Sequence, residues 1–160
     1  MIAGDRATVT VRVEVEPDVA FEVFTTEIDR WWRRGIAYRV AGRRPGTLHL
    51  EGRLGGRIFE EYEGSGLHEV GRVTAWEPPA RLAFEWRGAN FAPGEVTHVE
   101  VTFTRTESGA TELRLVHSGF AALRPDHPVR HGEAPGVFIG RIARWWGDLL
   151  TTFRERVDER

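Results

Sequence analysis

Six short strand-like segments separated by turn residues occupy the middle of the chain, and they restrict its fold more than any other feature. They cover residues 47–51, 57–63, 67–76, 81–87, 96–106 and 111–118. The breaks contain pairs such as Gly55-Gly56 and Pro78-Pro79, which are typical of tight turns between strands. Because strands joined in this way pair with their neighbours, the segment is predicted to form one antiparallel meander.

The N-terminal flank predicts one more strand and two short helices. Residues 8–16 alternate valine with polar residues, which indicates a half-buried strand. Pro17 suits the first position of a helix, and apolar residues follow it at helical spacing. Thr26 and Asp29 resemble a capping box with aspartate in place of glutamate. They predict a second short helix that carries the tryptophan pair following them.

The C-terminal flank predicts a long loop and then a long helix. Residues 120–136 contain three prolines and no periodicity, and loops of this length are usually mobile or functional. After Gly136, apolar residues recur at helical spacing for about twenty residues, which predicts an amphipathic helix. Its central stripe is expected to hold Phe138, Ile142, Trp145, Leu149 and Phe153, with Ile139, Trp146, Leu150 and Val157 beside it.

These elements predict a single α+β domain that spans residues 1–160. Their order is satisfied by a seven-stranded antiparallel sheet curved around the long C-terminal helix, with two short helices after the first strand. Where such a sheet and helix separate, they leave an apolar cavity, the usual setting of a small-molecule site. Residues 88–95 and 120–136 are expected at its mouth.

Composition argues against several classes of partner. The net charge is −2 and the 22 basic residues are spread along the chain, so no nucleic-acid partner is expected. The chain contains no cysteine, which rules out disulfides and thiolate metal sites, and we expect a cytoplasmic protein. No apolar run approaches the length of a membrane span.

The sequence also offers no metal or cofactor site. The six histidines, at positions 49, 68, 98, 117, 127 and 131, lack the tight spacing of metal ligands. The glycine pairs lie in hairpins instead of between a strand and a helix, which argues against phosphate binding. We therefore expect no metal and no cofactor.

One glutamate and one histidine are the candidates for acid–base chemistry. Phe59 and Glu61 share a strand face, so Glu61 points inward if Phe59 does. His117 ends the apolar row of Leu113 and Leu115, where it is either a polar ligand anchor or a histidine bonded to backbone. A Glu61–His117 pair across the cavity would supply a general acid and base, and the alternatives for Glu61 are a structural ion pair or exposure to solvent.

The cavity wall is expected to be apolar and aromatic. A buried tryptophan offers a large apolar surface and one N–H donor, which serve a core and a ligand equally well. Trp76, at a strand end, is expected to pack structurally. The residues expected to contact a ligand are Trp32, Phe59, Phe84, Trp86, Val101, Phe103, Leu115, His117, Ile142, Trp145, Trp146 and Leu149.

Several segments resemble one known family, in order and over nearly the whole chain. The most specific are GRVTAWEPP at residues 71–79, the next strand ending at Trp86, and LVHSGF at residues 115–120. They resemble the C-terminal domains of the activator of heat-shock-protein-90 ATPase homologue family, in the START-like, helix-grip superfamily SRPBCC. The resemblance implies a seven-stranded sheet around a C-terminal helix with a cavity between them. That superfamily includes binders, carriers and enzymes, so the fold does not specify one activity.

Three functions fit these features. The first is a carrier or sensor that encloses a small apolar or aromatic ligand. The second is an enzyme, such as a cyclase, dehydratase or hydrolase of a polyketide-like aromatic substrate, that uses Glu61 and His117. The third, from the resemblance, is a chaperone-linked protein-interaction domain. An apolar pocket would favour the carrier or sensor, a pocket with a paired Glu–His would favour the enzyme, and a filled core would favour the interaction domain. The sequence does not identify the ligand or the oligomeric state.

Overall fold

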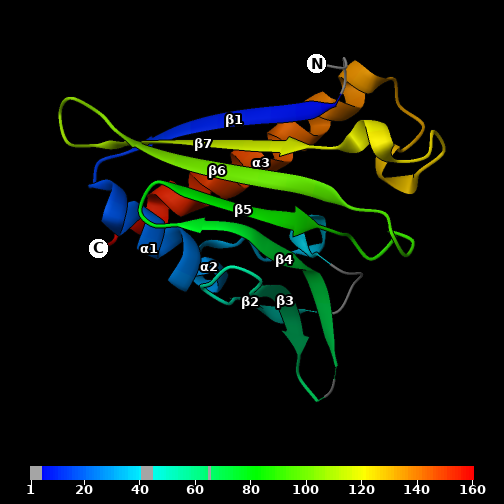
Figure 1. Cartoon of the computed structure of the whole chain (residues 1–160), viewed down its shortest axis with the longest axis horizontal. Helices are drawn as coiled ribbons and strands as arrows, with labels where there is room; N and C mark the ends of the chain where they lie inside the picture. The colour runs from blue at the N-terminus through cyan, green and yellow to red at the C-terminus, as the bar shows by residue number, and fades with distance from the viewer. Residues whose placement is uncertain (1–4, 41–44, 65) are drawn as a thin grey trace.

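The computed structural model describes residues 5–40, 45–64 and 66–160, which form a curved sheet around one long helix (Figure 1). The strands are β1 (Arg6–Val13), β2 (Gly46–Leu50), β3 (Arg57–Tyr62), β4 (Leu67–Glu77), β5 (Arg81–Trp86), β6 (Thr97–Arg105) and β7 (Thr111–Ser118). The helices are α1 (Pro17–Thr26), α2 (Ile28–Trp31) and α3 (Pro135–Asp158), with 3₁₀ turns η1 (Ile36–Tyr38), η2 (Phe120–Ala122) and η3 (Pro128–Arg130). The predicted α+β architecture is confirmed.

The described strands form one seven-stranded antiparallel sheet in the order β1-β7-β6-β5-β4-β3-β2. Consecutive strands from β2 to β7 are neighbours, which confirms the predicted meander, and β1 is added beside β7. In Figure 1, α3 runs along one face of the sheet, and β4 bends away from β5 toward the β2–β3 hairpin. The sheet therefore curves around the helix.

The inward faces of β5, β6 and β7 supply the sheet's side of the core. Strand parity predicts which residues point inward, and all of them are buried. They are Leu82, Phe84, Trp86, Val99, Val101, Phe103, Leu113, Leu115 and His117. Eight of these nine side chains are apolar, and burying one such aliphatic or phenylalanine side chain contributes about 1.5–3 kcal/mol. His117 is the exception.

One stripe of α3 faces the sheet, and it matches the predicted one except at the tryptophan pair. The buried residues are Phe138, Ile142, Trp146, Leu149, Leu150, Phe153 and Val157. Trp146 is 0% exposed, whereas Trp145 is only partly buried. The prediction that Trp145 lies in the core stripe was wrong, because its neighbour Trp146 takes that place. Adjacent helical residues point about 100° apart, so the two rings do not face the sheet together.

The two short helices form, but the predicted capping box does not. α1 begins at Pro17, as expected. Glu27, instead of Thr26, precedes α2, and no side chain caps that helix. Asp29 Oδ1 accepts a hydrogen bond from the backbone N of Leu48 at 2.9 Å. The capping prediction was wrong because this carboxylate joins α2 to β2.

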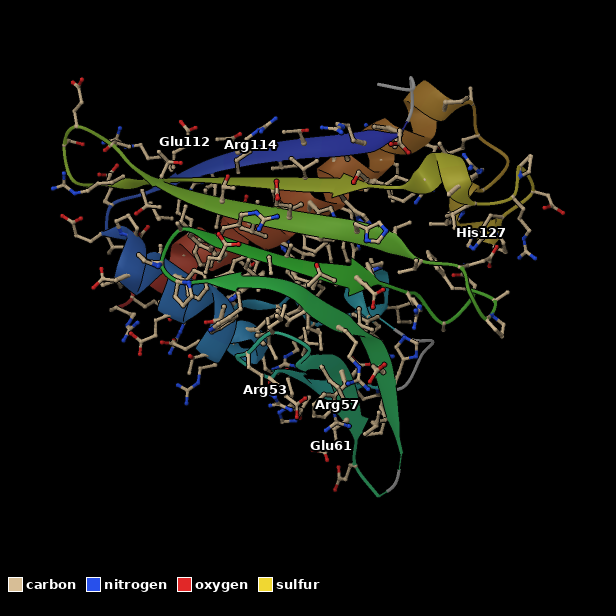
Figure 2. All side chains as sticks on the ribbon, in the orientation of Figure 1. Arg53, Arg57, Glu61, Glu112, Arg114 and His127 are labelled. Atoms are coloured by element: carbon tan, nitrogen blue, oxygen red, sulfur yellow. The ribbon has the colours of Figure 1, made fainter. Side chains whose placement is uncertain are left out.

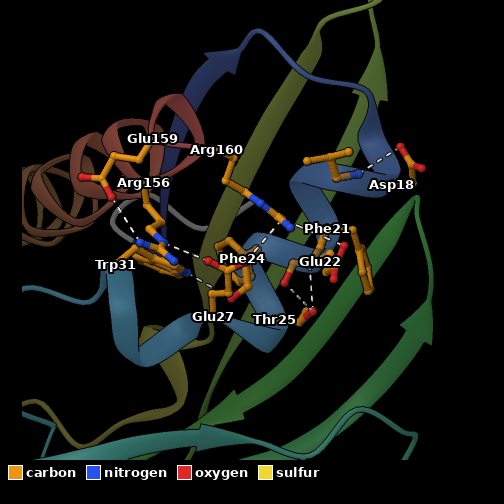
Figure 3. A network of polar contacts seen from close by, with 11 residues as sticks. Asp18, Phe21, Glu22, Phe24, Thr25, Glu27, Trp31, Arg156, Glu159 and Arg160 are labelled. Carbon is orange, nitrogen blue, oxygen red and sulfur yellow. Dashed lines mark hydrogen bonds and ion pairs between the residues drawn. The ribbon is translucent and has the colours of Figure 1, made fainter.

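Ion pairs hold the C-terminal end of α3 to the junction of α1 and α2 (Figure 3). Arg156 Nε lies 2.8 Å from Glu27 Oε1, and Arg160 Nη1 lies 3.3 Å from Glu27 Oε2. Arg156 Nη1 also lies 3.1 Å from Glu159 Oε2. Because the Glu27 side chain is only 15% exposed, solvent screens these pairs less than ordinary surface ones. This end of the helix is therefore fixed by charge as well as by apolar packing.

Candidate ligand-binding site

A pocket lies near the N-terminal end of α3, opposite the ion pairs. It has a volume of about 630 Å³ and is bounded by residues 37–40, the β5–β6 loop, residues after β7 and the first half of α3. In Figure 1 the β5–β6 loop and the segment after β7 lie at this same end of the sheet. The volume falls within the range of about 300–1,000 Å³ that is usual for small-molecule sites.

Aromatic rings form the pocket wall. Trp86 of β5, Trp145 of α3, Phe91 of the β5–β6 loop and Phe120 of η2 all line it. The ring centroids of Trp86 and Trp145 are 5.8 Å apart in an edge-to-face arrangement. Trp145 Nε1 donates to the carbonyl oxygen of Ala37 at 2.7 Å, which ties α3 to the segment around η1. The wall therefore offers a large apolar surface, and the hydrogen bond of Trp145 holds that ring in one orientation.

A second layer of rings supports this wall. Trp32 stacks on Trp86 with the centroids 6.0 Å apart, and Trp146 meets Trp86 edge-on at 5.6 Å. Trp32 Nε1 donates to the carbonyl oxygen of Tyr38 at 2.7 Å. The pair Trp145-Trp146 is thus divided between pocket and core, which explains why adjacent tryptophans occur on one helix.

His117 is a buried polar residue of the pocket wall. Trp146 Nε1 donates to His117 Nδ1 at 3.0 Å, and His117 Nε2 lies 2.8 Å from Thr97 Oγ1. Thr97 Oγ1 donates in turn to the carbonyl oxygen of Trp86 at 3.0 Å. Because an indole N–H can only donate, His117 Nδ1 accepts, and the neutral ring carries its proton on Nε2 and donates it to Thr97.

Burial determines the protonation state of His117. The residue is 3% exposed, and its pKa is lowered to about 3, chiefly by burial and also by the nearby His98. The ring is therefore neutral at physiological pH, and both nitrogens already have partners. The structure does not support the predicted roles of His117 as ligand anchor or as general acid and base, because either role needs a free ring nitrogen.

His127 joins the two loops at the pocket mouth. Its Nδ1 accepts from the backbone N of Val129 at 3.1 Å, and its ring packs edge-to-face on Phe91 at 4.7 Å. Nε2 lies 3.2 Å from Glu95 Oε1 without hydrogen-bond geometry. Burial lowers the pKa of His127, and Glu95 opposes this effect. The β5–β6 loop and the loop before α3 are thereby held together, as expected for segments that form a mouth.

The sequence from residue 14 to residue 136 matches the family model described as activator of Hsp90 ATPase homolog 1-like protein. The chain belongs to this family. No curated protein matches the sequence.

Solved structures share the helix-grip fold of this activator-like family. Protein MLL2253 from Mesorhizobium loti is 21% identical with a TM-score of 0.67, over 96% of this chain and 97% of that chain. An HSP90 activator from Plasmodium falciparum is 19% identical with a TM-score of 0.67, over 96% of both chains. An anthrahydroquino-gamma-pyrone synthase is 23% identical with a TM-score of 0.56, over 96% of this chain and 99% of that chain. At these identities the likeness is one of fold.

The predicted ligand residues lie in four places in this activator-like chain. Trp86, His117, Ile142 and Trp145 line the pocket, and Trp32 and Trp146 lie behind its wall. Phe84, Val101, Phe103, Leu115 and Leu149 are buried in the core and do not line the pocket. Phe59 packs on His49 and Arg57 of the β2–β3 hairpin.

The structure does not bring Glu61 and His117 together. Glu61 lies on β3 with its side chain 60% exposed, and its Oε1 is 3.3 Å from His49 Nε2. Figure 2 shows Glu61 on the β2–β3 hairpin, far from the pocket mouth that carries His127. Strands β4, β5 and β6 separate β3 from β7. The buried face of β3 holds Glu60 instead, so the expected acid–base pair across a cavity does not form.

Several pocket residues escaped the sequence reasoning. Residues 37–40 follow a glycine in a stretch without periodicity, and nothing in the sequence placed them against α3. Arg141 carried a usable signal, because it lies one helical turn before Trp145 and so shares its face. The two loops expected at the mouth do supply lining residues, including Asn90 and His131.

A second hollow, of about 650 Å³, lies at the other end of the molecule between α1 and the β4–β5 turn. Trp76 and Phe21 line it together with the acidic residues Asp18 and Glu22 of α1. Among the described residues, only two aromatic rings, those of Phe21 and Trp76, line this hollow, whereas four tryptophan and phenylalanine rings line the first pocket. We therefore take the pocket near the start of α3 as the candidate site.

Two further properties bear on the site. Within residues 5–40, 45–64 and 66–160, no three histidine or acidic side chains are placed to hold a metal ion together. Across the same ranges, no helix is both long and apolar enough to cross a membrane.

Proposed function

We propose that this protein is a carrier or sensor that binds a small aromatic or apolar molecule in the pocket near the start of α3. The observation that carries the proposal is the wall of Trp86, Trp145, Phe91 and Phe120, which faces an open volume of about 630 Å³ and not a filled core. Apolar pockets with a few fixed polar groups are the usual form of small-molecule sites.

Binding is favoured over catalysis by the state of the titratable groups. His117, the buried histidine of the wall, is neutral and has both ring nitrogens bonded, so it has no proton to exchange with a substrate. Glu61 is exposed on the β2–β3 hairpin. The synthase that shares the fold demonstrates that such a frame can host a reaction, but its identity to this chain is only 23%.

The chaperone-linked alternative rests on the names of relatives. It requires aromatic side chains on an open surface, as a partner-binding patch usually has. Here Trp31, Trp32, Trp86 and Trp146 are at most 9% exposed, and Trp145 faces the pocket. The distribution of aromatic side chains therefore supports a ligand inside the domain more than a protein partner outside it.

Binding of 2-naphthol, a neutral bicyclic probe, tests the proposal. We expect it to bind one to one, to quench tryptophan fluorescence and to raise the melting temperature, because it binds the folded chain alone. A concentration of 100 times Kd should stabilise the fold by roughly 2.7 kcal/mol, which corresponds to roughly 5–10 °C for a domain of this size. Fluorescence titration and differential scanning calorimetry measure the two effects.

A matched pair of variants locates the bound probe. Trp145→Ala removes part of the pocket wall and should weaken binding by about tenfold or more, whereas Trp76→Ala removes a partly exposed ring from the other hollow and should leave Kd unchanged. The reverse pattern would place the site at the α1 end. If 2-naphthol and larger aromatic probes change neither fluorescence nor melting, the proposed function is wrong.

A further inference from the structure

The charged side chains of the pocket are all basic. Arg39 and Arg141 line it, and none of the described lining residues is an aspartate or a glutamate. The positive charge of Arg141 is already paired, because its Nε lies 2.7 Å from Glu133 Oε1 and its Nη2 donates to the carbonyl oxygen of Val129. The two arginines are therefore not equivalent.

Arg39 carries the uncompensated charge. Its side chain is half-buried, and within the part of the chain that the structure describes its guanidinium has no hydrogen bond and no ion pair. Glu60 shares a smaller hollow of about 70 Å³ with Arg39, but its carboxylate is not within ion-pair distance. A cation removed from water without a partner is unfavourable, and an anion brought to it relieves that cost.

Resting on the proposed function, we propose that the ligand is an amphipathic anion, with an aromatic body against Trp86 and Trp145 and a carboxylate bound by Arg39. A guanidinium presents paired N–H donors that match the two oxygens of a carboxylate. The aromatic wall lowers the local dielectric constant and so strengthens this attraction. A neutral ligand of the same shape would cover Arg39 without neutralising it.

The inference is tested with two probes of nearly equal shape, naphthalene-2-carboxylate and naphthalene-2-carboxamide. Isothermal titration calorimetry at neutral pH measures Kd for each with the wild-type protein, Arg39→Gln, Arg39→Lys and Arg144→Gln. Arg144 is an exposed arginine of α3 that does not line the pocket, so its variant controls for the loss of one positive charge.

We expect the wild-type protein to prefer the carboxylate by about tenfold or more, a typical effect of one charge-assisted contact. Arg39→Gln should abolish this preference by weakening the carboxylate alone. Arg39→Lys should retain part of it, and Arg144→Gln all of it. Unliganded Arg39→Gln should melt at the temperature of the wild-type protein or slightly above it, because Arg39 has no partner to lose among the described residues and its unpaired charge is unfavourable.

Three results would overturn the inference. Equal affinity of the wild-type protein for both probes would reject the inference that the ligand is an anion and would leave the proposed function intact. If Arg39→Gln still preferred the carboxylate, a group other than Arg39 would be responsible for that preference. A loss of melting temperature in free Arg39→Gln that Glu60→Gln reproduces would show that Arg39 pairs with Glu60 instead. Failure of both probes to bind, together with failure of 2-naphthol, would instead reject the proposed function itself.

Discussion

Trp146→Ala should lower the free energy of unfolding by about 4–6 kcal/mol. About 3–5 kcal/mol comes from removing a buried aromatic ring and leaving a cavity, and about 1 kcal/mol more from His117, which loses its donor. Trp146 is 0% exposed, and its ring contacts Trp32, Trp86 and Trp145 as well as His117. Urea denaturation followed by far-ultraviolet circular dichroism measures this loss without relying on tryptophan emission.

Two variants serve as controls for this prediction. Trp146→Phe keeps most of the apolar volume but cannot donate to His117, so about 1–3 kcal/mol should be lost. Trp145→Ala removes a ring that is only partly buried and should cost about 1–2 kcal/mol. If Trp145→Ala destabilised the protein as much as Trp146→Ala, the division of this pair between pocket and core would be wrong.

His117 should make the stability of the fold depend on pH. Its pKa is lowered from 6.5 to about 3 by burial, so the unfolded chain takes up a proton that the folded chain refuses. The stabilisation is complete above pH 6.5 and is lost as the pH falls from 6.5 toward 3. Within this window each pH unit costs about 1.4 kcal/mol, so a fall from about pH 7 to about pH 5 should cost about 2 kcal/mol.

A comparison with His117→Gln isolates this contribution. Glutamine keeps one donor and one acceptor but does not titrate, so the variant should lose about 2 kcal/mol less than the wild-type protein between about pH 7 and pH 5. The change in unfolding free energy between the two pH values is measured separately for each protein, so a lower overall stability of the variant does not affect the comparison. The contribution of His127, whose pKa burial also lowers, is common to both proteins. Parallel pH profiles would show that His117 titrates normally.

The fold could be predicted from the sequence because its signals are local. Alternation along Val9, Val11 and Val13 and the turn pairs between later strands depend on neighbouring residues, and the structure confirms the strands that they predict. Trp145 and Trp146 show where this reasoning fails. Apolar spacing identifies a helix, but a stripe broad enough to include both residues does not indicate which ring turns toward the sheet.

The site could not be predicted in the same way, because it is formed by contacts between distant residues that local sequence patterns do not indicate. The partners of His117 come from β6 and α3, 20 and 29 positions away, and its neutral state follows from burial between these elements. The prediction for Glu61 failed for a related reason. Phe59 shares its strand face and is buried, but it packs against His49 and Arg57 of the hairpin, so its burial does not bring Glu61 into the core. Arg39 carries no local signal, and its importance comes from the absence of a partner among the described residues.

The ion pairs at one end of α3 and the pocket at the other imply that this helix is unequally stable along its length. Glu27, Arg156 and Arg160 fix the last turns, whereas the first turns begin with Pro135 and Gly136 and expose Val137 to 56%. Backbone amides of the first turns should therefore exchange with deuterium through local fraying, while those of the last turns exchange only with global unfolding. Such fraying would admit a ligand while the rest of the domain stays folded.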